Sequence, residues 1–225
     1  MLFTTANAQR LIGTTGLMNI PTAEMKPAGT FNGGITFMQK GATNKVYNYD
    51  TGIYYINFTP FSFIEFTFRE TLLKTVHSVK RTTGYYQQDR STTFRLRPIK
   101  EEGGKWWPSI VLGVNDIYSA YGDSYYTGVY GTITKGLSLN NAGKLSITAG
   151  YFKPYNNDKM YDGFFAGVEY KPLKSQPFCI TAEYDSKRIN VGAAYSLWNC
   201  VNIFCYTDEF KAIAAGISYQ HTIKF

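Results

Sequence analysis

Histidine and serine are the residues that could form a lipase-type or acyl-transfer site, because such a site needs a nucleophile beside a general base. The sequence holds only two histidines, His77 and His221. His77 falls in a long basic segment that we expect to be solvated, and His221 interrupts the apolar face of the last predicted strand. No serine is spaced to partner either histidine. The pattern predicts that the protein is not an enzyme and has no catalytic residues, with a lipid-modifying outer-membrane enzyme as the weaker alternative.

Charged side chains at alternating positions are the stronger functional candidates. They lie on the strand face that carries small and polar residues: Glu65, Arg69, Arg95, Arg97, Glu169, Glu183 and Asp185. Successive side chains of a strand point to opposite faces, so these groups are predicted to face one interior, the lumen of a barrel. Buried charges of opposite sign are expected to pair. The set predicts a salt-bridged polar core or, alternatively, the lining of a path for a polar or anionic glycan.

Cysteine usage points to no metal and no cofactor. The three cysteines are Cys179, Cys200 and Cys205. They form no CxxC pair and no Cys/His cluster at zinc-ligand spacing, so we interpret them as unpaired packing residues.

The composition favours a membrane barrel over a soluble domain. Aromatic residues make up 17% of the 225 residues and charged residues also 17%, the latter below the roughly 25% typical of soluble domains. An apolar exterior around a polar interior produces this balance. The formal charge of +7 is spread without a long basic run, which indicates a partner such as anionic lipopolysaccharide and not nucleic acid.

Alternation of apolar and polar residues recurs along the whole chain and predicts an all-β, antiparallel transmembrane β-barrel of about twelve strands. The last strand is typical, with Ile213, Ala215 and Ile217 on one face. The predicted strands are 29–40, 49–59, 61–73, 89–98, 106–116, 124–134, 143–152, 162–171, 177–185, 188–197, 199–206 and 210–224. Between the third and fourth, Lys74 to Gln88 is expected to be a long, basic outer loop.

Three parts are expected along the chain. Residues 1–8 end in Ala6-Asn7-Ala8, which resembles a signal-peptidase site, and are predicted to be a residual signal peptide. Residues 9–28, rich in Gly and Pro, are predicted to be an N-terminal periplasmic or plug-like segment. Residues 29–225 are predicted to form the barrel. The alternating tail with Tyr219, Ile223 and a final Phe225 is the pattern that outer-membrane assembly machinery reads.

Three sequence segments resemble the YjbH family of outer-membrane barrels associated with exopolysaccharide and capsule operons. They are the opening run Gly13-Thr-Thr-Gly-Leu-Met-Asn-Ile-Pro21-Thr-Ala followed by Gly29, the stretch Gly113-Val-Asn-Asp116-Ile up to Lys135, and Gly163-Phe-Phe-Ala-Gly-Val-Glu169-Tyr with Ala182-Glu-Tyr-Asp185 and Asn190-Val-Gly192. Longer family members carry a second large region, so this chain is similar to a short, single-barrel member.

The resemblance implies a role in surface polysaccharide production or export at the outer membrane of a Gram-negative bacterium. The implied partners are outer-membrane lipid and lipopolysaccharide, the barrel assembly machinery, other envelope proteins and a polysaccharide. A second hypothesis is a non-catalytic structural subunit of a multi-protein outer-membrane complex. Fold alone does not decide between these functions.

Overall fold

The computed structural model describes residues 9–43, 48–103, 105–120, 124–156, 160–172 and 177–223. Twelve strands follow one another within them: β1 (Thr30–Met38), β2 (Thr51–Phe61), β3 (Ile64–Val76), β4 (Thr83–Ile99), β5 (Ser109–Ser119), β6 (Gly128–Ser138), β7 (Lys144–Pro154), β8 (Gly163–Lys171), β9 (Phe178–Tyr184), β10 (Ile189–Leu197), β11 (Val201–Asp208) and β12 (Ala212–Thr222). Two short 3-10 helices, η1 (Lys40–Ala42) and η2 (Asn140–Ala142), lie between strands. In these ranges no helix has the length and apolar character needed to cross a membrane.

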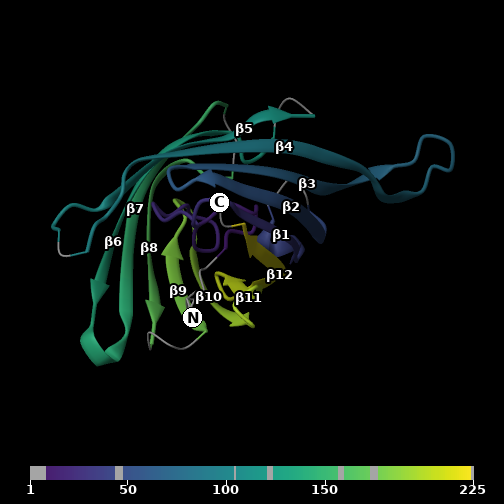
Figure 1. Ribbon diagram of the computed structural model, residues 1–225. Coiled ribbons are helices and arrows are strands. Elements are labelled where there is room, and N and C mark those ends of the chain that lie inside the picture. Colours follow the sequence, from purple (N-terminus) through teal and green to yellow (C-terminus); the bar gives the residue numbers. More distant parts are fainter. Residues whose placement is uncertain are drawn as a thin grey trace.

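The strands form one closed antiparallel barrel, which confirms the predicted fold (Figure 1). Each strand pairs with its neighbours in sequence, and β12 closes the barrel on β1 through an unbroken register from Thr30↔Thr222 to Met38↔Ala214. Closure leaves no unpaired sheet edge around the wall. We call the end where β1 begins and β12 finishes the termini end, and the opposite end the loop end.

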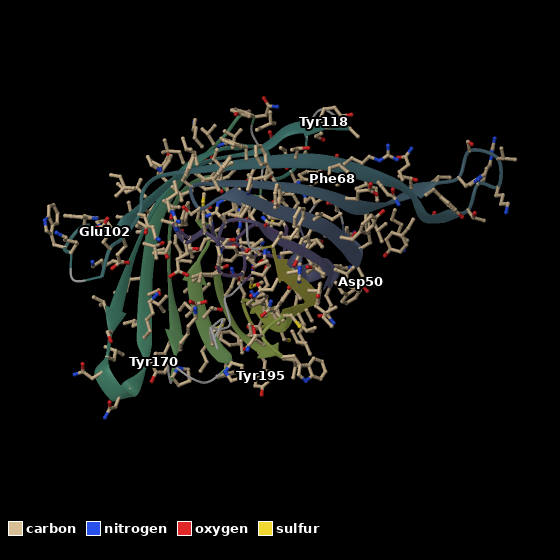
Figure 2. The ribbon with its side chains drawn as sticks, in the orientation of Figure 1. Asp50, Phe68, Glu102, Tyr118, Tyr170 and Tyr195 are labelled. Carbon is tan, nitrogen blue, oxygen red and sulfur yellow. The ribbon has the colours of Figure 1, made fainter. Side chains whose placement is uncertain are left out.

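The predicted alternation holds around the wall. In β12, Ile213, Ile217 and Tyr219 are exposed on the outer surface, while Ala214 and Ser218 are buried inside. Phe68, Tyr118 and Tyr195, which are labelled in Figure 2, are exposed in the same way on other strands. The outer surface is therefore apolar and aromatic and the inner surface is small or polar, as a membrane barrel requires.

The segment Lys74–Gln88 is mostly strand, so the prediction of a long loop there was wrong. Only residues 77–82 form the turn, and β3 pairs with β4 out to Val76↔Thr83. The pairs with the flanking strands β2 and β5 stop at Thr71 and Ser91. The ends of β3 and β4 thus form a two-stranded ribbon that projects beyond the barrel (Figure 1). Thr, Val and Tyr in this segment favour extended structure, which outweighs the turn character of the basic residues.

Residues 9–28 contain no regular strand and form two isolated bridges, Gln9↔Thr15 and Gly16↔Pro21. In Figure 1 this segment lies within the ring of strands. Nearly all of it is buried, including the side chains of Arg10, Leu17 and Lys26. We refer to residues 9–28 as the plug. Residues 1–8, the predicted signal-peptide remnant, and Phe225 of the predicted assembly signal lie outside the described residues.

Candidate functional site

All seven charged residues singled out in the sequence are buried inside the barrel. Their strands bring them to different levels and sides of the lumen, so they do not form one compact site. Several of them bind the plug and others bind the wall. The lumen is therefore best described as four groups: two carboxylate clamps on the plug, an arginine cluster towards the loop end, further ion pairs along the wall, and a cationic group towards the termini end.

The first clamp is Glu65 of β3, which binds both the wall and the plug. Its carboxylate accepts hydrogen bonds from the backbone N–H of Thr15 at 3.0 Å and from the Thr15 hydroxyl at 2.6 Å. Arg95, its partner in register on β4, lies 2.8 Å away in an ion pair. The Arg95 guanidinium also donates to the carbonyl oxygens of Thr22 and Glu24. One buried ion pair thereby holds the plug at two places, around Thr15 and around Thr22 to Glu24.

The second clamp is Glu183 of β9, a strand on the opposite side of the barrel from β3. Its carboxylate accepts three consecutive backbone N–H groups of the plug, from Met18 at 3.0 Å, Asn19 at 2.8 Å and Ile20 at 3.4 Å. Successive N–H groups around one anion form a concave binding site, or nest. Asp185 adds a bond from the Asn19 amide at 2.9 Å. Here the wall supplies the anion and the plug supplies the nest.

Two glycines let the plug fold this tightly. Gly13 has φ +87°, and a Cβ atom there would lie 2.3 Å from the ring of Tyr55 on β2. At Gly16 a Cβ atom would collide with the carbonyl oxygen of Ile20 and the side chain of Arg10. Arg10 ties the two halves of the plug together, donating to the Asn19 carbonyl at 2.7 Å and to the Thr14 hydroxyl at 3.1 Å. The Gly-rich sequence is therefore a packing requirement.

The arginine cluster towards the loop end centres on Arg69. Its guanidinium contacts the Asp116 carboxylate at 2.7 Å and the Ser124 hydroxyl at 3.2 Å, and it lies 4.5 Å from the ring centroid of Tyr126. Asp116 reaches the lumen because β5 carries a bulge, with φ +54° at this residue and a register shift against β4. The bulge turns both Asn115 and Asp116 inwards, which a regular strand cannot do.

A further set of ion pairs lines the wall. Arg188, in the turn after β9, contacts Asp208 at 2.6 Å and Asp185 at 4.0 Å. Glu169 and Lys171 of β8 pair at 2.9 Å. Most inward charges are thus neutralised by partners on the wall, which suits the interior of a closed structure.

The cationic group towards the termini end includes Arg97 of β4 and Lys26 of the plug. Arg97 donates to the carbonyl oxygen of Ser62, and the Lys26 ammonium donates to Gln220 at 3.0 Å. Burial, reinforced by Lys171, lowers the pKa of Lys26 to about 8 although Glu65 opposes the shift. Burial alone would raise the pKa of Glu24, but Lys171 and the other cations nearby hold it below its usual value.

The comparisons with known proteins agree with this architecture. A family model described as YjbH, exopolysaccharide biosynthesis protein YbjH, matches residues 8–159. The chain belongs to the YjbH family. No match was found among curated proteins. The matched range takes in the whole plug, both partners of the Glu65–Arg95 pair and the Arg69–Asp116 pair, so these contacts lie in the part of the chain that the family model describes.

Solved structures of other proteins superpose on this YjbH-family chain. The KdgM porin superposes with a TM-score of 0.50 at 5% identity, covering 87% of this chain and 99% of the porin. The outer-membrane phospholipase A from Escherichia coli superposes with a TM-score of 0.39 at 10% identity, covering 88% of this chain and 98% of that one. At such identities the likeness to the porin concerns the barrel fold alone.

Sequence reasoning missed several lumen residues of this YjbH-family barrel. Arg10 and Lys26 lie in a segment without periodicity, so no pattern indicated their direction. Asp116 belongs to a quoted sequence motif, but strict alternation places it outside, since Asn115 faces in. Of the predicted assembly signal, Tyr219 and Ile223 are exposed on the outer surface.

Among the described residues no His, Cys, Asp and Glu side chains gather as a metal-ion site. What the lumen residues can do chemically is bind: two carboxylates each hold several plug donors, and each sits beside a second polar wall residue, Arg95 or Asn190. The arrangement can hold the plug in place, and release requires new partners for both carboxylates.

Proposed function

We propose that this YjbH-family barrel resides in the outer membrane and acts in surface exopolysaccharide production, with the plug keeping its lumen closed until a partner or the polymer displaces it. Family membership supports the biological role. The observation that supports a closed lumen is the pair of clamps, in which Glu65 of β3 and Glu183 of β9 bind the plug. A polymer can cross only when those bonds are exchanged.

The outer surface supports the placement in a membrane. Exposed large apolar side chains occur on all twelve strands, among them Ile35, Ile56, Phe164 and Ile203. In water such a continuous apolar surface would be costly, whereas in a bilayer it matches the lipid. Trp106 and Trp198, in exposed turns at the termini end, suit the boundary between lipid and water. We expect lipopolysaccharide and the barrel assembly machinery among its partners.

A non-catalytic structural role in a multi-protein outer-membrane complex is the second candidate. The ribbon at the ends of β3 and β4 favours it, because residues 72–76 and 83–90 are paired almost only with each other. Free strand edges outside the barrel can accept a strand of another protein. This role needs no open lumen, so the two candidates differ in whether the plug moves.

We infer that neither candidate involves catalysis by histidine. His77 lies in the ribbon turn, where its Nδ1 accepts the backbone N–H groups of Val79 and Lys80. His221 lies on the outer wall close to the termini end of β12. The two residues sit at opposite ends of the barrel, and the ring nitrogen of His77 that could act as a base is engaged.

Conductance of the purified protein in planar bilayers tests the closed lumen. Wild type is expected to be nearly silent, and Glu183→Gln together with Glu65→Gln to open intermittently, since a neutral amide holds N–H donors less strongly than a carboxylate. The matched control is Glu169→Gln, a buried wall carboxylate paired with Lys171. Large, steady conductance of wild type would refute the closed state.

The same variants separate the two candidate roles in cells. If export requires plug movement, a disulfide that ties the plug to β3 abolishes exopolysaccharide secretion in the oxidised state and restores it on reduction. If the protein is a structural subunit, the locked barrel supports normal secretion, and shortening the ribbon disrupts the complex that co-purifies with it.

A further inference from the structure

A continuous hollow runs along the outer wall at the seam between β1 and β12. The part nearer the loop end, about 490 Å³, is lined by residues of β1, β2, β3, β11 and β12, including Phe37, Tyr54 and Leu72. The part nearer the termini end, about 310 Å³, continues along Gly33, Val201 and Tyr219. The two parts share Ile35 and Ile217. We call this hollow the seam groove.

Small residues on the outer face create the groove. Gly33 of β1, Gly52 of β2 and Ala215 of β12 stand where neighbouring strand positions carry Phe, Tyr or Ile. A Cβ atom at Gly33 would meet only one atom, at 3.7 Å, so the space in front of it is open. Four residue steps separate Gly33 from Phe37, so at 3.3 Å per residue the groove is roughly 13 Å long. That is close to the roughly 15 Å depth of one leaflet, half of the hydrocarbon core.

The two ends of the groove differ in chemistry. At the loop end, Lys40 lies in η1, three residues after Phe37 of β1. Lys74 lies on β3, two residues after Leu72. Among the described residues neither lysine has a carboxylate within ion-pair distance. At the termini end the exposed ring of Tyr219 lies beside the groove. The groove is thus apolar along its length, and Lys40 and Lys74 stand at one end of it. The Lys74 ammonium lies 6.0 Å from the ring centroid of Tyr85, and the backbone N–H of Lys40 donates to the Asp50 carboxylate at 2.9 Å.

We propose that the seam groove binds one acyl chain of an anionic lipid of the outer leaflet, with the lipid phosphate beside Lys40 and Lys74. The proposal rests on the membrane placement given above. The apolar lining accounts for the chain, the length matches one leaflet, and the two lysines complement the phosphate charge. A second copy of the protein fits less well, because a two-fold interface places the same surface on both copies and would bring their lysines together.

Native mass spectrometry of the detergent-purified protein tests this with two probes of equal chain length, dimyristoyl phosphatidylglycerol and dimyristoyl phosphatidylcholine. We expect saturable binding of one phosphatidylglycerol, at least tenfold tighter than phosphatidylcholine. Ala215→Leu fills the groove and should weaken binding about tenfold, or about 1.4 kcal/mol. Gly33→Leu fills it from the other strand and guards against a folding defect in the first variant.

The matched control is Ala149→Leu, an outward-facing position on β7 away from the groove. It should bind phosphatidylglycerol as wild type does. Lys40→Gln with Lys74→Gln should remove the preference for phosphatidylglycerol and leave binding of phosphatidylcholine unchanged. A gel shift on boiling checks that each variant is folded.

Equal binding of the two lipids, or unchanged binding in both groove-filling variants, overturns the proposal. So does a dimer that oxidation traps through Cys205, which is exposed on β11 within the groove, because a second copy would then be the occupant. None of these results bears on whether the plug closes the lumen, so the two proposals fail independently.

Discussion

Removing the carboxylate of Asp116 should destabilise the barrel strongly, because it leaves a buried guanidinium without its counter-charge. The Arg69 and Asp116 side chains are 1% and 0% exposed and lie 2.7 Å apart. Losing one partner of such a pair typically costs about 3–5 kcal/mol. Asp116→Asn is the suitable change, since Asn tolerates the positive φ of the bulge and keeps the side-chain volume.

The double variant isolates the ion pair from other effects. Arg69→Met with Asp116→Asn removes both charges, so it should be more stable than Asp116→Asn alone by at least about 2 kcal/mol, which is a coupling energy typical of residues in contact. Arg69→Met alone leaves a buried carboxylate and should also be destabilised. The Ser124 and Tyr126 contacts stay available to Arg69 in Asp116→Asn and set a lower limit on its stability.

Urea unfolding in detergent micelles, followed by tryptophan fluorescence and by the gel shift on boiling, measures these differences. Glu209→Gln serves as the control, because its pair with Lys211 is exposed and should contribute little. If Asp116→Asn loses less than about 1 kcal/mol, or if the double variant is no more stable than the single ones, water solvates Arg69 and Asp116 and their ion pair contributes little to stability.

Three further predictions concern the plug and the ribbon. Because burial lowers the pKa of Lys26 to about 8 from 10.5, the unfolded chain binds more protons between these values, so the free energy of unfolding should rise from pH 8 to pH 10.5; Lys26→Met should flatten this rise in urea titrations at the two pH values. Gly13→Ala should unseat the plug by forcing a Cβ atom into Tyr55, visible as faster proteolysis of residues 9–28, whereas unchanged protection would show that the plug can shift at no cost. Replacing residues 74–87 by a short turn should leave the gel shift on boiling intact, since the ribbon pairs mostly with itself; loss of that shift would mean that the ribbon is needed for folding.

The fold could be read from the sequence because one rule, alternation, governs every strand of a barrel. Ile64, Phe66 and Phe68 face outwards and Glu65, Thr67 and Arg69 face inwards, as predicted. Strand ends were less predictable. The basic turn residues Lys80 and Arg81 are typical of a solvated loop and so predict one, whereas pairing between β3 and β4 continues beyond the barrel wall.

The site was less predictable, because it depends on features that break the periodic pattern. The bulge at Asp116 reverses the direction of one side chain, and no residue type in β5 indicates that a bulge is present. The plug has no periodicity, so its position depends on tertiary contacts such as those of Thr15 with Glu65. Sequence could indicate which charges face the lumen, but not which of them bind the wall and which bind the plug.

The clamps explain why an irregular segment can be stable inside a barrel. Buried backbone N–H groups need acceptors, and the plug lacks the regular pairing that would supply them. Glu65 and Glu183 accept five plug donors between them, each bond to a charged acceptor contributing roughly 1.5–3 kcal/mol. The same carboxylates would be left buried without those partners if the plug moved. Opening therefore requires replacement donors at both carboxylates, whether they come from water that enters the lumen, from a ligand or from a partner protein.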